Sequence, residues 1–298
     1  MSKKNLIFAI LMIVAWAFYF VLCRICITAT DSPFVAGLLL RTMTLTFLSS
    51  YWVITKKENT ISNPAKPFLL TISIGIIAFI FDALINIGFQ YIPVSIGTVL
   101  LKTEILFVLL FSLLLFKVRI EKRKYLFITL MLLGVILCMN LQSSDMTFNL
   151  YSLLFIASAA LNAICAFAIK HIQEKYSTGS FAIAYTNNIV SLVLYGICAA
   201  SFDRQQFIDL FFNADDIWSV VIIFVLCSVC QTCLMITYYR NLKELPVWIV
   251  KAFLLFVPAL SMIIEFAIFR TTISLISLVG FLLVIIGGLG ITIDSKHT

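Results

Sequence analysis

Ten apolar segments, each close to the length of a membrane-spanning helix, constrain the fold of this chain more than any other feature of its sequence. They occupy residues 5–23, 34–54, 68–88, 94–116, 124–141, 150–170, 180–202, 216–238, 246–268 and 272–293. An α-helix needs about 20 apolar residues to cross the hydrocarbon core of a bilayer. Because 62% of the residues are hydrophobic and only 12% are charged, one globular core cannot bury this surface. The sequence therefore predicts an all-α integral membrane protein with ten transmembrane helices.

Basic residues gather in alternate loops between these segments. One set of loops holds only Arg24, Arg204 and Arg270, whereas the other set and the terminal segments hold most of the lysines. Because basic loops tend to stay in the cytoplasm, we expect a multi-pass protein of the cell membrane with both termini cytoplasmic. The first segment is expected to be a retained helix and not a signal peptide. The formal charge of +7 comes from these short loops, so no nucleic-acid partner is expected.

An internal repeat divides the chain into two halves. Ile92-Pro93-Val94 opens the fourth segment, and Leu245-Pro246-Val247 opens the ninth, 153 positions later. We interpret residues 1–145 and 146–298 as two five-helix repeats of one transport unit. Because five is an odd number, the repeats must be inserted in opposite orientations. Inverted repeats of this kind place a substrate site between the halves, near the bilayer midplane.

Several short motifs resemble those of a known family. They are Trp16 with Arg24, Pro33 with Arg41, and the glycine-containing tails that begin at Gly134 and cover residues 280–290. On these motifs the chain resembles, over essentially its whole length, the EamA-type branch of the drug/metabolite transporter superfamily. The resemblance implies a secondary transporter built from ten helices in two repeats. The chain departs from the family pattern in the fourth segment, which lacks the proline that Pro258 supplies in the ninth.

Two charged residues lie deep inside the fourth apolar segment. Lys102 is about 12 Å from the start of its helix, which is too deep for its ammonium group to reach the surface easily. It is expected to bind a substrate carboxylate or phosphate, or else to form a structural ion pair with Asp82 or Glu104. Glu104 lies about 200° further around the helix, so we expect that the two side chains do not both point into one cavity. Glu104 is either a proton-coupling carboxylate or a structural partner.

Polar side chains also follow one face of the third segment. Asp82, Asn86 and Gln90 are four residues apart, so they form a stripe on an otherwise apolar helix. Such a stripe is expected to face the protein interior, either at a substrate cavity or in hydrogen bonds between helices.

The ninth segment carries a comparable stripe. Lys251, Pro258, Met262 and Glu265 share one face, and Pro258 removes a backbone hydrogen bond, so we expect a bend there. Lys251 either faces the cavity or extends to the cytoplasmic surface. Glu265 lies near the outer end, where it could pair with Arg270 or Arg41.

Aromatic side chains supply a third group of candidates. Trp16 and Tyr19 share a face of the first segment, and Tyr185 shares one with Asn188 in the seventh; these are candidates for stacking on or binding a substrate, although aromatic packing is the alternative. The cluster of Tyr238, Tyr239 and Trp248 is interpreted as part of an interfacial aromatic belt. The predicted substrate-binding residues are therefore Trp16, Tyr19, Asp82, Asn86, Lys102, Glu104, Tyr185, Asn188, Lys251 and Glu265.

No motif for catalysis, metal binding or a cofactor is recognisable in the sequence. It contains no phosphate-binding loop, and its eight cysteines lie inside apolar runs, where they are expected to fill helix contacts.

We expect a secondary transporter that moves a small charged or zwitterionic metabolite, most simply an exported amino acid, by alternating access as a monomer or homodimer. Its expected partners are the bilayer and, where a proton gradient drives transport, a coupling proton. Alternatives are uptake or exchange of a larger metabolite, such as a nucleotide-like or sulfonium compound, and a non-transporting receptor or enzyme.

Overall fold

The computed structural model describes residues 3–55, 65–116, 122–140, 150–212, 217–270 and 275–294, and every regular element in these ranges is a helix. The elements are α1 (Lys3–Thr30), α2 (Pro33–Thr55), α3 (Ala65–Tyr91), α4 (Val94–Leu100), the 3₁₀ turn η1 (Leu101–Thr103), α5 (Glu104–Phe116), α6 (Lys122–Asn140), α7 (Ser152–Tyr176), α8 (Ser180–Phe202), α9 (Arg204–Phe212), α10 (Ile217–Glu244), α11 (Val247–Leu254), α12 (Val257–Phe269) and α13 (Leu275–Asp294).

Seven helical stretches in the described part of the chain are long and apolar enough to cross a membrane. They are Asn5–Thr30, Pro33–Thr55, Phe68–Tyr91, Val94–Phe111, Ser152–Tyr176, Ser180–Phe202 and Trp218–Glu244. Two shorter apolar helices, Val257–Phe269 and Leu278–Gly290, accompany them. The predicted all-α, multi-pass class is confirmed, whereas the number of ten spans remains a prediction.

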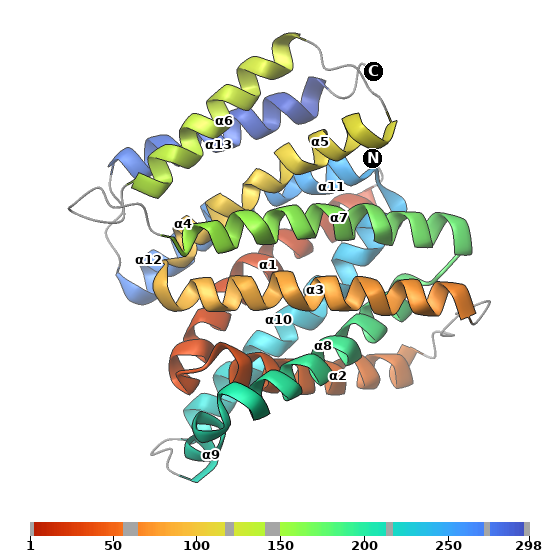
Figure 1. Cartoon of the computed structure of the whole chain (residues 1–298), viewed down its shortest axis with the longest axis vertical. Coiled ribbons are helices and arrows are strands. Elements are labelled where there is room, and N and C mark those ends of the chain that lie inside the picture. Colours follow the sequence, from red (N-terminus) through yellow and green to blue (C-terminus); the bar gives the residue numbers. More distant parts are fainter. Residues whose placement is uncertain are drawn as a thin grey trace.

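Helices from the two halves of the sequence pack in pairs. In Figure 1, α6 lies along α13 at the top of the view, and α3 lies beside α7 near its centre. The pairs α1 with α10 and α2 with α8 complete the lower part of the bundle. Each pair joins a helix before residue 141 to one after residue 149, so the core lies between the halves. The predicted boundary at residues 145–146 falls outside the described residues.

Two of the predicted spans are broken near their middle. The fourth is interrupted by η1, and the ninth by a turn at Leu255–Phe256. Pro258 explains the second break, because proline has no backbone N–H and its ring clashes with the carbonyl four residues earlier. The repeat offset of 153 positions superimposes residues 101–103 on 254–256, so the breaks occupy equivalent places. The first break has no proline and was not expected from the sequence.

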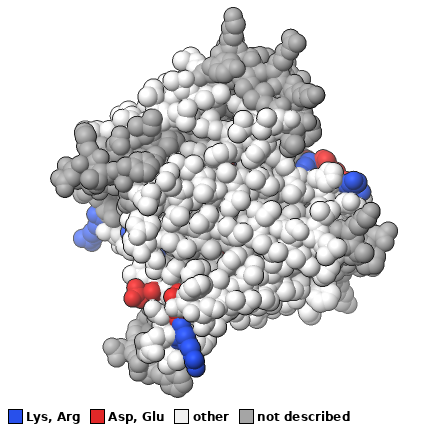
Figure 2. Space-filling view, viewed as in Figure 1, with Lys and Arg blue, Asp and Glu red and all other residues white. Residues whose placement is uncertain are grey.

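The outer surface fits a membrane-embedded protein. In Figure 2, the described residues on the face in view are almost entirely uncharged, and the charged side chains among them lie near its margins. Large apolar side chains are exposed along the helices, for example Val193 at 55%, Ile222 at 57% and Ile263 at 64%. Soluble proteins rarely expose this much contiguous apolar surface to water. The basic loop residues 56, 57, 117 and 119 lie outside the described residues, so the orientation of the termini remains a prediction.

Candidate functional site

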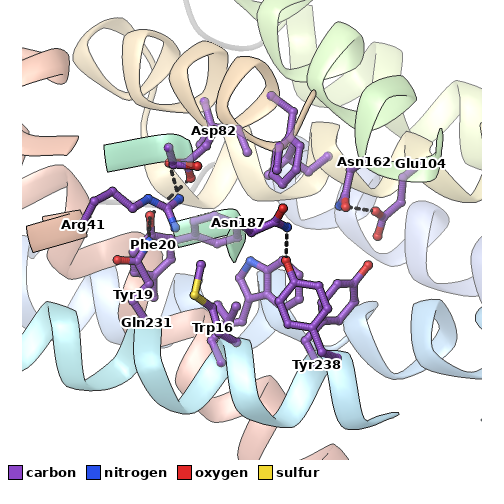
Figure 3. A pocket seen from close by; sticks show the side chains of 18 of the residues that line it. Trp16, Tyr19, Phe20, Arg41, Asp82, Glu104, Asn162, Asn187, Gln231 and Tyr238 are labelled. Carbon is purple, nitrogen blue, oxygen red and sulfur yellow. Dashed lines mark hydrogen bonds and ion pairs between the residues drawn. The ribbon is translucent and has the colours of Figure 1, made fainter. Parts of the chain in front are cut away.

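A cavity of about 70 Å³ lies at the centre of the bundle, between the two halves. Residues of α1, α2, α3, η1, α5, α7, α8 and α10 form its wall. The polar and aromatic members of that wall are Trp16, Tyr19, Phe20, Arg41, Phe81, Asp82, Lys102, Glu104, Asn162, Asn187, Ser191, Gln231, Tyr238 and Tyr239. Figure 3 shows Arg41 and Asp82 toward one end and Asn162 and Glu104 toward the other, with Trp16 and Tyr238 between them. The cavity thus has two charged ends.

The first charged end is the Arg41–Asp82 ion pair. Arg41 donates to Asp82 Oδ2 at 2.6 Å, and both side chains are buried. Two tyrosine hydroxyls also donate to this carboxylate, Tyr195 to Oδ2 at 2.8 Å and Tyr19 to Oδ1 at 3.3 Å. When its amide oxygen faces Arg41, Gln231 accepts from the guanidinium at 3.1 Å. A buried charge is tolerated only when it is paired and hydrogen-bonded, and both members of this pair are.

The second charged end is centred on the Glu104 carboxylate. Its Oε2 accepts from Lys251 at 2.9 Å and from Asn162 at 2.7 Å. Lys251 also donates to the Tyr238 hydroxyl at 3.1 Å. The Lys102 ammonium lies 4.0 Å from Oε1, too far for a hydrogen bond. Lys102 therefore lies beside a carboxylate that is already paired with another lysine.

Aromatic rings form the wall between the two ends. The Trp16 and Tyr238 rings meet edge to face with their centroids 5.1 Å apart, and Tyr239 follows at 5.6 Å from Tyr238. Asn187 donates to the Tyr239 hydroxyl at 2.5 Å. Such rings offer an apolar body and polar edges, so they can contact an organic solute and orient its polar groups.

Five of the ten predicted site residues line the cavity, and they are Trp16, Tyr19, Asp82, Lys102 and Glu104. The expectation that Lys102 and Glu104 could not both face it was wrong. A 3₁₀ turn advances about 120° per residue, so η1 brings two positions that differ by two residues within about 120° of each other. Their long side chains then reach the same cavity.

The other five predicted residues lie outside the cavity wall. Asn86 donates to Tyr195 at 2.9 Å, and Asn188 donates to the Arg41 carbonyl at 2.9 Å, so both support the first charged end from behind. The Tyr185 hydroxyl lies 3.1 Å from the hydroxyl of Ser49.

The surroundings of Lys251 and the ion-pair partner of Glu265 differ most from those predicted. Lys251 is fully buried and does not extend to the surface, because Glu104 holds it inside the protein. Glu265 pairs with Arg24 at 2.7 Å, and not with Arg270 or Arg41. Its carboxylate also accepts from the backbone N–H groups at the start of α4, at 3.1 Å from Val94 and 2.7 Å from Ser95.

Sequence reasoning missed several residues of the wall. They are Arg41, Asn162, Asn187, Ser191, Gln231, Tyr238 and Tyr239. An arginine inside an apolar segment, as at Arg41, was the available signal, because such a charge is costly unless it is used. Tyr238 and Tyr239 were assigned to the interfacial belt but are buried, with 5% and 6% exposure. The side chain of Trp248 lies outside the described residues.

Metal ligands do not converge in the described ranges. Within them, no group of three or more His, Cys, Asp or Glu side chains could hold a metal ion, and the seven described cysteines are free thiols. The Cys227 and Cys23 thiols instead donate to a neighbouring helix, to the Tyr19 carbonyl and the Asn86 side chain respectively.

Comparisons with known proteins agree with this architecture. The model of the EamA-like transporter family matches residues 3–140 and again 149–293. A search of curated proteins finds no match. Among 28 matching solved chains, one titled "Crystal structure of protein" has a TM-score of 0.69 and 12% sequence identity, with 100% of this chain and 99% of that chain covered, which shows a shared fold. The two family matches account for both repeats, and the chain belongs to the EamA-like transporter family.

Proposed function

We propose that this protein is a secondary transporter that moves a small zwitterionic metabolite, such as an amino acid, across the cell membrane by alternating access. Membership of a transporter family supports the general role. The central cavity supports the site, because it lies between the repeats and is lined by charged and aromatic side chains.

The charge balance of the cavity carries the proposal. Arg41 is paired with Asp82, and Lys251 is paired with Glu104. Lys102 is 4% exposed and makes no hydrogen bond to any residue that the structure describes. One buried cation is therefore not neutralised by a carboxylate of its own. An anionic group on the solute would neutralise it, because a buried charge is stable only with a partner.

The rest of the cavity fits the other parts of an amino acid. Among the described residues Glu104 Oε1 accepts no hydrogen bond, and the Lys102 ammonium lies 4.0 Å from it, so this oxygen can accept from a solute amine. Trp16, Phe20 and Tyr238 offer apolar surface for the solute side chain. A cavity of about 70 Å³ is far below the 300–1,000 Å³ typical of larger ligands, so a nucleotide-like solute would need the walls to move apart.

The broken helices supply elements that can move. The α4–η1–α5 and α11–α12 segments border the second charged end, and their breaks occur at equivalent places in the two repeats. In alternating access, one repeat rocks against the other around a fixed site. Because the sequence contains no phosphate-binding loop, a proton gradient or exchange is the proposed energy source, and export is the proposed direction.

Flux measurements in proteoliposomes test this function. The purified protein is reconstituted and offered radiolabelled glycine, leucine, phenylalanine, glutamate and lysine, and exchange against the same solute is followed. We expect at least one to be transported, and we expect Lys102→Met to raise its KM by about 10- to 100-fold, the effect of losing a charged hydrogen bond.

Lys243→Met is the matched control, because Lys243 is an exposed lysine of α10 outside the cavity. It should leave KM unchanged. An absence of flux for every solute, in vesicles shown to contain folded protein, would refute the proposed amino-acid transport. An unchanged KM in Lys102→Met would remove Lys102 from the site.

A further inference from the structure

A second cavity, of about 280 Å³, lies at one end of the same helix group. Its wall contains Phe8 of α1, Tyr51 of α2, Ser180 and Phe181 of α8, and Ile236, Arg240 and Glu244 of α10. The helices α1, α2, α8 and α10 thus line both this cavity and the central one. None of the predicted site residues lies in it.

Arg240 gives this cavity its chemical character. The guanidinium carbon lies 4.0 Å above the centre of the Phe8 ring, so the planar group is held against an aromatic face. Arg240 makes no hydrogen bond or ion pair with a residue in the described ranges, so its N–H donors are free for a ligand. The uncapped start of α8, at Gly179 and Ser180, adds backbone N–H groups that favour negative charge. Glu244 adds one exposed carboxylate to the wall, which suits a ligand that also carries a positive group.

Two adjacent residues of α10 line the two cavities. Tyr239 lines the central cavity, and the next residue, Arg240, lines the second. The Tyr239 carbonyl accepts from Gln173 at 3.0 Å and from Ser180 at 3.2 Å, and its hydroxyl accepts from Asn187. This set of hydrogen bonds joins α7, α8 and α10 where a solute would pass.

The Arg24–Glu265 ion pair lies further along α1, beyond the central cavity. Along α1, Phe8, Trp16 and Arg24 are eight residues apart, so the second cavity, the central cavity and the Arg24–Glu265 ion pair follow one another at intervals of about 12 Å. Glu265 joins α1, α4 and α12 there through Arg24, Val94 and Ser95. The second cavity therefore lies on the other side of the central cavity from this ion pair.

We propose that the second cavity is an anion-binding entry site, in which Arg240 binds the anionic group of a small zwitterionic solute before it passes Tyr239 into the central cavity. The entry role rests on the proposed transport function. The order of steps is binding at Arg240, breakage of the hydrogen bonds that hold Tyr239, and transfer to Lys102. Arg240 follows the eighth apolar segment, 216–238, on the side predicted to be cytoplasmic, so solute would enter from that side.

Charged thiol reagents test the site without any transport measurement. Ile236→Cys places a thiol in the second cavity, and Ser191→Cys places one in the central cavity. In the full-length protein in detergent, with each rate divided by the reagent's rate with a free thiol, the anionic reagent sulfonatoethyl methanethiosulfonate should modify residue 236 about tenfold faster than its cationic trimethylammonium analogue. Adding Arg240→Gln should abolish that preference and slow modification at residue 191 by the anionic reagent. The parent protein, with its native cysteines, gives the background rate.

Lys243→Gln is the matched control, since Lys243 is an exposed cation of the same helix outside the cavity, and it should change neither rate. Equal rates for both reagents at residue 236, after division by their rates with a free thiol, would overturn the anion site. If Arg240→Gln left the rate of modification at residue 191 unchanged, the role of the second cavity as the entry would be overturned. Native mass spectrometry with added phosphatidylglycerol tests a lipid phosphate as the ligand, and an adduct that disappears in Arg240→Gln would overturn the solute assignment. If no solute were transported in proteoliposomes but the reagent rates came out as expected, the proposed transport would be refuted and the anion site would still be supported.

Discussion

Lys251 places its ammonium group 2.9 Å from the Glu104 carboxylate and so joins the broken helix of the second half to that of the first. Neither residue has an equivalent in the other repeat, because Thr98 and Val257 occupy the positions 153 residues away. The pair therefore breaks the symmetry of the repeats. It also fixes Glu104 so that only one of its oxygens remains near Lys102.

Removal of one partner from this pair should destabilise the protein strongly. Lys251→Met leaves Glu104 buried with Asn162 as its remaining hydrogen-bond donor among the described residues and with the Lys102 ammonium 4.0 Å away, and breaking a buried pair costs up to about 3–5 kcal/mol. The double variant Glu104→Gln/Lys251→Met should recover only part of this loss, because it also removes the carboxylate nearest to buried Lys102 among the described residues. Chemical denaturation in detergent micelles measures both. Strictly additive losses in the double variant would show that the two residues do not act as a pair.

Opening of the Arg24–Glu265 contact should expose the end of α1. Glu265→Gln removes the ion pair and weakens the bonds to the start of α4, so the buried thiol of Cys26, half a turn from Arg24, should become accessible. We expect its reaction with a water-soluble maleimide to accelerate about tenfold, as read by peptide mass spectrometry.

A matched carboxylate change is available on the surface. Glu174 pairs with Lys170 at 3.3 Å but its side chain is 66% exposed, and such pairs contribute about 0–1 kcal/mol. Glu174→Gln should therefore leave Cys26 protected. If the maleimide labelled Cys26 at the same rate in both variants, the Glu265 contacts would not be what protects Cys26.

Local properties of the chain were predictable, and partners distant in sequence were not. The membrane class follows from segment length and apolarity, and Lys102 and Asp82 stand out because a charge in an apolar segment is costly wherever the helix packs. Pro258 marks its break for a similar reason, since its effect on the backbone is intrinsic.

The pairing of Glu265 shows why the rest was not accessible. The sequence suggested Arg270 or Arg41 as its partner, whereas the actual partner, Arg24, lies 241 positions away and is brought close only by the packing of α1 on α12. Tyr238 was misassigned because the sequence cannot distinguish an aromatic residue that faces lipid headgroups from one that faces a cavity when both lie near a predicted helix end. No residue type in the sequence predicts the η1 turn, so it could not be anticipated that Lys102 and Glu104 both face the central cavity.

The Tyr238 side chain should contribute more through its ring than through its hydroxyl. Tyr238→Phe removes the acceptor 3.1 Å from Lys251 but keeps the contact with Trp16, so a loss of about 1–2 kcal/mol is expected. Tyr238→Ala also removes the buried ring and should cost about 3–5 kcal/mol. Denaturation of both variants in the same detergent gives the comparison, and equal losses would contradict a wall built on ring packing.

Close contact between α6 and α13 depends on glycine at Gly287. A Cβ atom at that position would lie 2.7 Å from the Phe127 carbonyl oxygen and 2.8 Å from the Met131 nitrogen, both backbone atoms that cannot move independently of α6. Gly287→Ala should therefore push the helices apart and lower the free energy of unfolding by about 1–3 kcal/mol. Gly196→Ala is the control, because its nearest neighbour would be a Leu38 methyl carbon at 3.7 Å. Alanine there should be neutral or stabilise α8 by up to about 1 kcal/mol, and a stable Gly287→Ala variant would show that this contact is not close in the membrane.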